Sequence, residues 1–185
     1  MTFRYRFWLF TATFLIGFGL SAVDHTNATV ALVRPFSDNP LALRAAFGVA
    51  ALLVVLAAAI RTWAAAYLRS SVVHDGRLHT DALVASGPYR YVRNPLYIGG
   101  LLLSLGMGML ASRIGAIVIV GGALAITLAL IDEEERQLTA AQGESYAAYH
   151  RAVPRLVPSL TPRLPAANLP PRWGQAFAGE AMFWG

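Results

Sequence analysis

The chain has 185 residues, of which 56% are hydrophobic and only 14% charged. About a quarter of a soluble domain is normally charged, so this composition excludes an ordinary soluble protein and favours a membrane protein. The chain contains neither cysteine nor lysine, which excludes disulfides, thiolate metal sites and lysine-based covalent catalysis. Its net charge of +5 therefore comes from arginine. We expect these arginines to serve membrane topology and anionic headgroups, because no basic run interleaved with aromatic residues indicates nucleic-acid binding.

Four apolar stretches predict an all-α, multi-pass bundle of about four transmembrane helices. The predicted spans are residues 7–23, 41–60, 95–111 and 114–131. The first stretch could be a signal peptide, but its apolar run is long for one and a poor cleavage site follows it. We therefore expect a retained first span.

The third predicted span begins at Pro95 and is rich in glycine. Its glycines are Gly99, Gly100, Gly106 and Gly108. Small residues let membrane helices approach closely, and they can also leave space for a ligand against the backbone. The sequence allows both interpretations.

The positions of the arginines predict the orientation of the spans. Arginines cluster before the first span, within residues 61–94 and after the fourth span, whereas the other side receives only Arg34, Arg44 and Arg113. Cytoplasmic loops carry the excess of positive charge, so both termini and residues 61–94 are predicted to be cytoplasmic. The polar segment that follows residue 131 is therefore predicted to be helical and to lie in the cytoplasm with residues 61–94.

A cationic loop, residues 87–94, leads directly into the third span. Asn94 followed by Pro95 is a helix-start signal, because Asn caps helices and Pro at the first position loses no hydrogen bond. Arg90 and Arg93 lie just before this start, where free N–H groups and the helix dipole also attract anions. The loop therefore predicts either an anion site or a pair of arginines at lipid headgroups.

Four acidic residues, 132–135, follow the fourth span directly. They form either a solvated helix extension with Glu–Arg pairs or a carboxylate site that faces the arginine loop or a cationic ligand. Gly143 is predicted to end one helix and start another. Tyr146 and Tyr149 then share a helix face, a spacing typical of packing or interface anchoring.

The remaining segments carry weaker signals. His74 and His79, with Asp75 and Asp81, fit no helix face well, so we predict no metal site. The proline-rich stretch up to Pro171 is predicted to be extended. Residues 173–185 are apolar but too few to span, so we expect them to lie on the membrane, or the chain to be truncated before a final helix.

Residues 87–99, 134–138 and 143–155 together resemble one family, the isoprenylcysteine carboxyl methyltransferases with their phospholipid methyltransferase relatives. Residues 87–99 resemble the signature G-x-Y-R-x-x-R-[HN]-P-x-Y-x-G, and residues 134–138 resemble E-E-x-x-L. Residues 143–155 are similar to the tail G-x-x-Y-x-x-Y-x-x-x-V-P-R. The resemblance covers residues 80–160. Asn94 stands where the family often has His, and Asn can still cap the helix and hydrogen-bond a ligand.

The resemblance implies methyl transfer from S-adenosylmethionine to a lipid-like or prenylated acceptor that enters from the bilayer. The cofactor carboxylate would suit Arg90, Arg93 and the start of the third span. Glu134, with Glu135 second, would suit its ribose hydroxyls and ammonium, and Tyr97 its adenine. The implied cofactor contacts are Tyr89, Arg90, Arg93, Asn94, Pro95, Tyr97, Gly99, Glu134 and Glu135, and the implied acceptor contacts are Tyr146 and Tyr149.

The implied catalytic residues are Arg93, Glu134 and Arg155. A carboxylate acceptor needs no base and could be held by Arg155 or Arg93, whereas an amine must lose a proton to a Glu or Tyr. Two alternatives stay open, an NADPH-dependent membrane reductase of the sterol reductase type and a non-catalytic membrane protein with the same fold. We predict one domain over residues 1–185, with N-terminal spans (1–79), a cofactor-binding core (80–160) and a tail (161–185).

Overall fold

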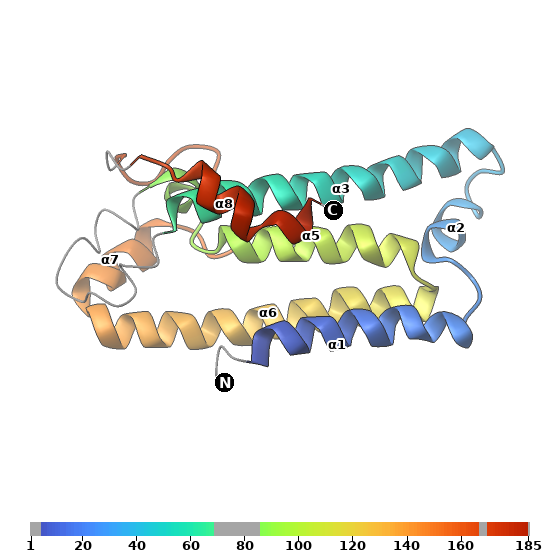
Figure 1. Cartoon of the computed structure of the whole chain (residues 1–185), viewed down its shortest axis with the longest axis horizontal. Helices are drawn as coiled ribbons and strands as arrows, with labels where there is room; N and C mark the ends of the chain where they lie inside the picture. Colours follow the sequence, from blue (N-terminus) through green and yellow to red (C-terminus); the bar gives the residue numbers. More distant parts are fainter. Residues whose placement is uncertain (1–4, 69–85, 167–169, 185) are drawn as a thin grey trace. The chain divides into compact units, whose positions relative to one another are not determined.

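The computed structural model describes residues 5–68, 86–166 and 170–184, and the regular secondary structure within them is helical. The predicted histidine and aspartate group at 74–81 lies outside them. The helices are α1 (Arg6–Gly19), α2 (Ala28–Val33), α3 (Pro40–Tyr67), α5 (Pro95–Leu110), α6 (Arg113–Gln142), α7 (Glu144–Ala152) and α8 (Trp173–Gly179), with single 3-10 turns η2 (Leu20–Ala22), η3 (Gly87–Arg90) and η4 (Ala181–Phe183) (Figure 1). Within the described residues there is no strand, so the all-α prediction is confirmed there.

Two of the described helices are long and apolar enough to cross a membrane. They are α3, with 28 residues and a mean hydropathy of 2.4, and α6, with 30 residues and 2.6. The apolar helices α1 and α5 are shorter, and the 16 residues of α5 extend for about 24 Å, less than the hydrocarbon thickness of about 30 Å. The count of four spans and the cytoplasmic termini therefore stay predictions.

The long helices extend past the predicted spans. The helix predicted for 41–60 continues to Tyr67, and the one predicted for 114–131 continues to Gln142. The extensions contain Ala64, Ala65 and Ala66 in α3 and a run of Glu, Arg and Gln in α6, all good helix formers that need no lipid. The helix start at Pro95 is confirmed.

The chain forms two compact units. One unit comprises Met1–Ala57 and Gly100–Leu130, and the other comprises Ala58–Gly99 and Ile131–Gly185. The predicted cofactor-binding core, residues 80–160, contributes residues to both units. The single-domain description of the chain stays a prediction.

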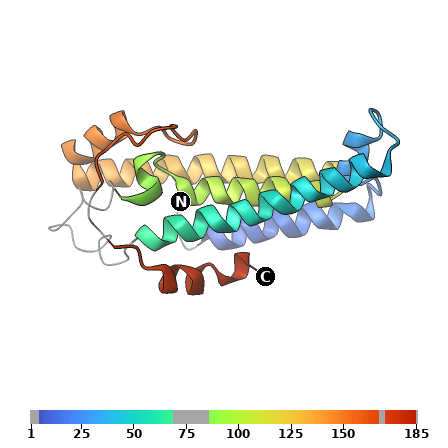
Figure 2. The ribbon, with the colours of Figure 1, turned by 90° about the horizontal axis from the view of Figure 1, so that it is seen from above.

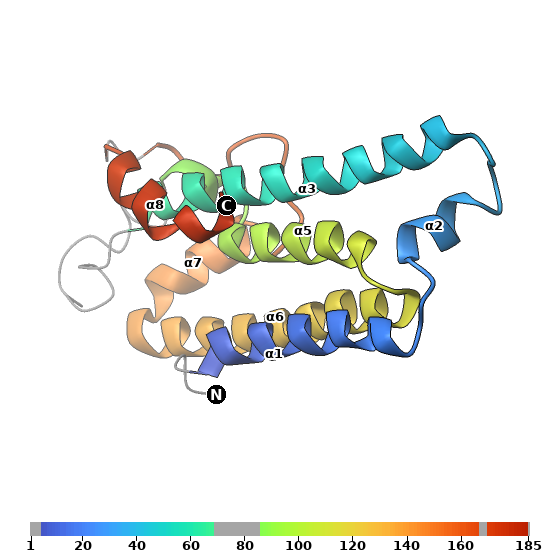
Figure 3. The ribbon, with the colours of Figure 1, turned by 45° about the vertical axis from the view of Figure 1, so that its right-hand side comes forward.

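Close approaches at glycine hold the first unit together, as expected for membrane helices. A Cβ on Gly106 of α5 would lie 2.8 Å from the Ala50 carbonyl oxygen of α3, whereas one on Gly100 would meet nothing within 4 Å. Helices α1 and α6 run side by side (Figures 1 and 3), and a Cβ on Gly115 would lie 2.2 Å from the carbonyl oxygen of Gly17. The close-packing interpretation of glycine is thus confirmed at Gly106, and the sequence analysis missed Gly17 and Gly115.

We expect Gly115→Ala to lower the free energy of unfolding by about 1–3 kcal/mol, because the added methyl group overlaps backbone that cannot move aside. The control is Gly121→Ala in the same helix, where a Cβ meets nothing within 4 Å. That change should be neutral or stabilising by up to about 1 kcal/mol, since Ala favours helix over Gly. Thermal unfolding of the detergent-solubilised variants measures both, and equal melting temperatures would contradict the close α1–α6 contact.

The buried carboxylate of Asp24, in the loop after α1, accepts a hydrogen bond from the first turn of α6. This contact was not predicted from the sequence. Asp24 Oδ2 accepts from the N–H of Ile114 at 3.1 Å, and its Oδ1 lies 3.1 Å from Arg113 Nη2. The first N–H groups of a helix have no acceptor within the helix. Asp24, 90 residues from Ile114 in the sequence, provides that acceptor for α6. Helix α2 was also missed, although Asn27 caps it by accepting from the N–H of Val30 at 3.1 Å.

This contact predicts a pH dependence of stability. Hydrogen bonds from Arg113 and the Ile114 N–H hold the pKa of Asp24 below its usual value. A depressed folded-state pKa means that the unfolded chain binds more protons, so this stabilisation is present above the unfolded pKa of about 4 and is lost as the pH falls further. We expect Asp24→Asn to remove that acid-labile part. Unfolding of both proteins from pH 7 to pH 3 checks it, and parallel curves would contradict it.

The second unit is built around the end of α6. Gly143, with φ at +57°, ends α6 and precedes α7, which folds back from the end of α6 (Figures 1 and 3). The predicted break at Gly143 is therefore confirmed. Residues 153–166 are non-helical, and α8 lies beside the end of α3 (Figures 1 and 2), where the N–H of Arg172 donates to the Ala66 carbonyl at 2.8 Å.

Candidate functional site

The loop that precedes α5 is shaped by a strained glycine. Gly87 begins the 3-10 turn η3 with φ at +54°, a conformation that side chains disfavour. A Cβ on Gly87 would lie 2.4 Å from Cδ2 of Tyr67, at the end of α3. Glycine therefore lets the loop pass directly over the Tyr67 ring.

Arg93 joins this loop to α6 and α7. Its Nε lies 3.3 Å from Glu135 Oε1 of α6, and its Nη1 donates to the His150 carbonyl of α7 at 2.7 Å. The backbone N–H of Arg93 donates to the Pro154 carbonyl at 2.9 Å. The two side chains of the ion pair are only 7% and 13% exposed, so the pair is largely shielded from water. The loop, the acidic run and the segment after α7 thus meet at one arginine.

Glu135 is the centre of a charged cluster, which we call the Glu135 cluster. Besides Arg93, its carboxylate faces His150 Nε2 at 3.5 Å, Arg155 Nε at 3.5 Å and Asn94 Nδ2 at 3.4 Å. The Arg155 guanidinium also pairs with Asp132, and the Arg155 carbonyl accepts from Asn94 Nδ2 at 3.1 Å. The cluster therefore contains three cationic or titratable basic side chains around one carboxylate.

An open cavity of about 700 Å³ borders this cluster. Its lining residues are Asp132, Glu135, Arg136, Thr139, Ala140 and His150. Within the described part of the chain, no group of three or more His, Cys, Asp or Glu side chains is arranged to hold a metal ion. The cavity is thus a charged depression beside the ends of α6 and α7.

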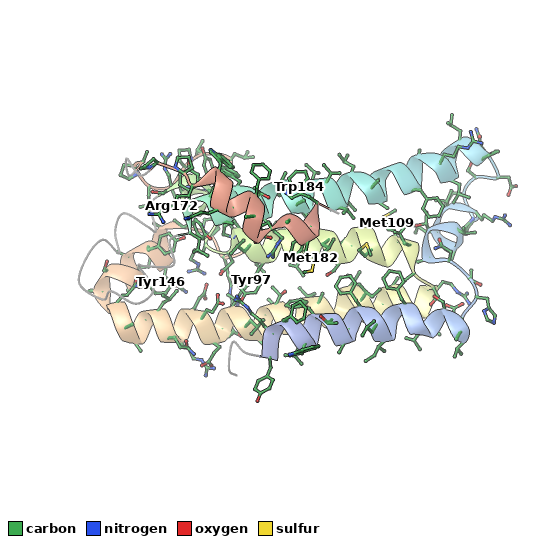
Figure 4. All side chains as sticks on the ribbon, in the orientation of Figure 1. Tyr97, Met109, Tyr146, Arg172, Met182 and Trp184 are labelled. Atoms are coloured by element: carbon green, nitrogen blue, oxygen red, sulfur yellow. The ribbon has the colours of Figure 1, made fainter. Side chains whose placement is uncertain are left out.

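Glu134 makes a different contact from its neighbour. The hydroxyl of Tyr97, in the first turn of α5, donates to Glu134 Oε1 at 2.6 Å, and Figure 4 labels this tyrosine. Pro95 and Gly99 in the same turns are buried. Residues that the resemblance assigns to the cofactor are therefore in direct contact, with Tyr97 paired to Glu134 and Arg93 paired to Glu135.

Arg90 lies elsewhere in the loop. Its Nε donates to the Leu164 carbonyl at 2.8 Å, and its own carbonyl accepts from the N–H of Arg163 at 2.9 Å. The structure thus uses Arg90 to hold the segment after α7 and does not bring it to the Glu135 cluster. Arg90 and Arg93 therefore have separate partners, and their binding of one anion stays a prediction.

Tyr146 and Tyr149 lie in the apolar core of the second unit with Val153 and Leu164. The Tyr149 hydroxyl donates to the Tyr89 carbonyl at 3.1 Å. Burial raises the pKa of Tyr146 to about 12 and raises that of Tyr149 above its usual range. Both phenols therefore keep their protons at neutral pH and can donate hydrogen bonds but not accept a proton. Their predicted contact with an acceptor stays a prediction, and packing is the role that the structure gives them.

Several buried donors have spare capacity, which is the property expected of a site for an oxygen-rich ligand. The hydroxyl of Tyr89 is buried and has no hydrogen-bond partner. The Nε atoms of Arg93 and Arg155 face Glu135 but make no well-aligned hydrogen bond. Arg93, Glu134, Tyr97 and Tyr89 thus offer cationic, anionic and neutral polar groups. This set combines hydrogen-bond donors with a carboxylate acceptor, the combination that a zwitterionic ligand with hydroxyl groups requires.

The partners that complete these contacts were not among the predicted site residues. Asp132 and His150 are members of the Glu135 cluster, and Arg61 of α3 pairs with Glu180, with Nε 2.6 Å from Oε2. Asp132 could have been found within the acidic run, because it precedes Glu135 by about one helical turn. Arg61 and Glu180 are 119 residues apart, and no local pattern connects them.

Residues 45–144, just over half of the chain, match the phospholipid methyltransferase family. The chain therefore belongs to that family, a group of methyltransferases, and the resemblance inferred from its motifs is confirmed at this level. Together with the two membrane-length helices, this membership indicates association with a membrane. The matched range contains residues 87–99, Glu134 and Glu135, and it ends before Tyr146.

One curated relative is the cobalt-zinc-cadmium resistance protein CzcN of Cupriavidus metallidurans, which is 36% identical over 109 residues. The match covers 58% of this chain and 47% of the relative, so the chain spans just under half of that protein's length. No solved structure matches the chain.

Proposed function

We propose that the chain is an S-adenosylmethionine-dependent integral membrane methyltransferase that acts on a lipid-like or prenylated acceptor. Family membership supports the methyl transfer. The contacts of the 87–94 loop and the first turn of α5 with the acidic run, at Arg93–Glu135 and Tyr97–Glu134, support the position of the cofactor. These contacts are the observation that carries the proposal, because residues about 40 positions apart in sequence form one polar site.

Arg93, Glu134 and Tyr97 would each have a separate role in binding the cofactor. Arg93 would hold the carboxylate of the cofactor, and Glu134 its ammonium or ribose hydroxyls, with Tyr97 fixing the Glu134 carboxylate through its hydrogen bond. When bound, S-adenosylmethionine supplies a methyl group already activated by a positive sulfur. The chain therefore needs mainly to align the acceptor and exclude water.

The acceptor determines whether a proton must move. A carboxylate acceptor is already ionised, and Arg155 could hold it with its planar guanidinium. An amine acceptor must give up a proton, and the raised pKa values of Tyr146 and Tyr149 leave Glu134 as the proton acceptor that we propose.

Calorimetric titration of the purified protein with S-adenosylhomocysteine and, separately, NADPH tests the proposal. We expect S-adenosylhomocysteine to bind and NADPH to give no heat. Binding of NADPH alone would instead support a membrane reductase, and binding of neither would support a non-catalytic protein.

A second experiment identifies the acceptor. The protein is incubated with methyl-labelled cofactor and native lipid extract, and the labelled lipid is isolated. A label released by mild alkali indicates a methyl ester and hence a carboxylate acceptor, whereas a label that resists alkali indicates an amine. No transfer to any lipid despite cofactor binding would contradict the lipid-like acceptor.

A further inference from the structure

Arg61 connects three segments of the second unit. Its Nε and Nη2 reach the two carboxylate oxygens of Glu180 at 2.6 and 3.1 Å, a bidentate pair with side chains 21% and 11% exposed. Its Nη1 donates to the carbonyl of Leu96, in the first turn of α5, at 3.3 Å. The ring of Phe183 covers the guanidinium, with its centroid 4.0 Å from Cζ.

The segment that carries Glu180, residues 172–184, has an anchor on α3 at each end. The N–H of Arg172 donates to the Ala66 carbonyl at 2.8 Å, and Trp184 Nε1 donates to Thr62 Oγ1 at 2.9 Å. Figure 4 labels Arg172 and Trp184 at the two ends of the segment. Glu180 lies between these anchors and provides the segment's ion pair with Arg61. The 172–184 segment therefore lies along the end of α3 and is held there at both ends, with the Arg61–Glu180 ion pair between them.

The residues next to this contact belong to the proposed cofactor site. Leu96, which Arg61 holds, is followed by Tyr97, whose hydroxyl binds Glu134. Burial raises the pKa of Tyr89, and the nearby charges of Glu134 and then Arg61 and Glu180 also act on it. The buried hydroxyl of Tyr89, which has no hydrogen-bond partner, thus lies within electrostatic reach of both the Tyr97–Glu134 pair and the Arg61–Glu180 pair.

We propose that the Arg61–Glu180 pair is a positioning device that holds the 172–184 segment on the end of α3 and sets the first turn of α5 for ligand binding. This inference rests on the proposed function and adds two residues that act through others. Neither Arg61 nor Glu180 contacts the ligand. Arg61 holds the backbone that leads into Tyr97, and Glu180 holds the 172–184 segment against Arg61.

The arrangement predicts reciprocal coupling. If holding the segment on α3 favours the ligand, the ligand must favour the held segment by the same factor. Binding of S-adenosylhomocysteine should therefore slow hydrogen exchange in residues 172–184 of the unchanged protein. Opening the ion pair should weaken binding by the corresponding amount.

The test compares Glu180→Gln with Glu144→Gln in the full chain. Glu144 forms a similar pair with Arg151 at 3.7 Å, but its side chains are 86% and 68% exposed and lie in α7. We expect Glu180→Gln to weaken the affinity for S-adenosylhomocysteine about tenfold and to speed hydrogen exchange in residues 172–184. Glu144→Gln should change neither quantity. Should Glu180→Gln fail to fold, Arg61→Lys keeps the charge but loses the bidentate geometry, and it should show the same two effects.

The outcomes separate the inference from the proposed function. An unchanged protein that does not bind S-adenosylhomocysteine would contradict the proposed function, and the inference with it. If the unchanged protein binds but Glu180→Gln binds equally well, only the inference is wrong, whether or not the segment exchanges faster. A drop in affinity without faster exchange in residues 172–184 would also overturn it, because the segment would then not be the element that moves.

Discussion

Replacing Glu135 by alanine should lower the free energy of unfolding by about 3 kcal/mol. The reason is the charge that would remain. Arg93 is only 7% exposed and would lose its carboxylate partner, while Arg155 and His150 would lose a shared acceptor. An uncompensated buried cation is costly because the interior cannot replace the water it has lost.

Denaturant or thermal unfolding in detergent measures the change. The control is Glu144→Ala, which breaks the exposed pair with Arg151 and should alter the free energy of unfolding by less than about 1 kcal/mol. A small effect of Glu135→Ala would mean that water reaches the Glu135 cluster. The ion pairs of the cluster would then not stabilise the fold.

Glu134→Gln should instead weaken cofactor binding and leave stability nearly unchanged. The amide oxygen can still accept the hydrogen bond from Tyr97, so the fold loses little. It can no longer pair with an ammonium, and charged hydrogen bonds contribute about 1.5–3 kcal/mol, which corresponds to a loss of affinity for S-adenosylhomocysteine of about 10- to 150-fold.

Glu133→Gln is the matched control for this experiment. Glu133 is the preceding residue of α6 and pairs with Arg136 and Gln137 on the surface. Calorimetric titration of both variants should show a loss only for Glu134→Gln. Equal affinity of Glu134→Gln and the unchanged protein would remove Glu134 from the proposed cofactor site.

The helices could be predicted from the sequence because their signals are local. Asn94-Pro95 marks a helix start by capping chemistry, and Gly143 marks a break because its backbone adopts a positive φ. The end of α3 could not be placed, since alanine continues a helix equally well in lipid and in water, whereas Gly143 marked the end of α6. Apolar content alone therefore located the spans but not their ends.

The partners within the site could not be predicted from the sequence, even where the residues could. The resemblance identified both Glu134 and Glu135 and ranked Glu134 first, but neighbouring helical residues point about 100° apart. Which of them meets Arg93 depends on the rotation of α6, which tertiary packing sets. Arg61 with Glu180, and Asp24 with the start of α6, are likewise contacts over long sequence separations that no local pattern encodes.

The break at Gly143 also sets the angular phase of α7. His150, which is 3.5 Å from Glu135, is the seventh residue after Gly143, and each residue advances a helix by about 100°. One residue added or removed between Gly143 and His150 would rotate the His150 imidazole away from the Glu135 carboxylate. The same change would displace Arg155 from Glu135. The interval from Gly143 to Arg155 should consequently tolerate changes of residue type far better than changes of length.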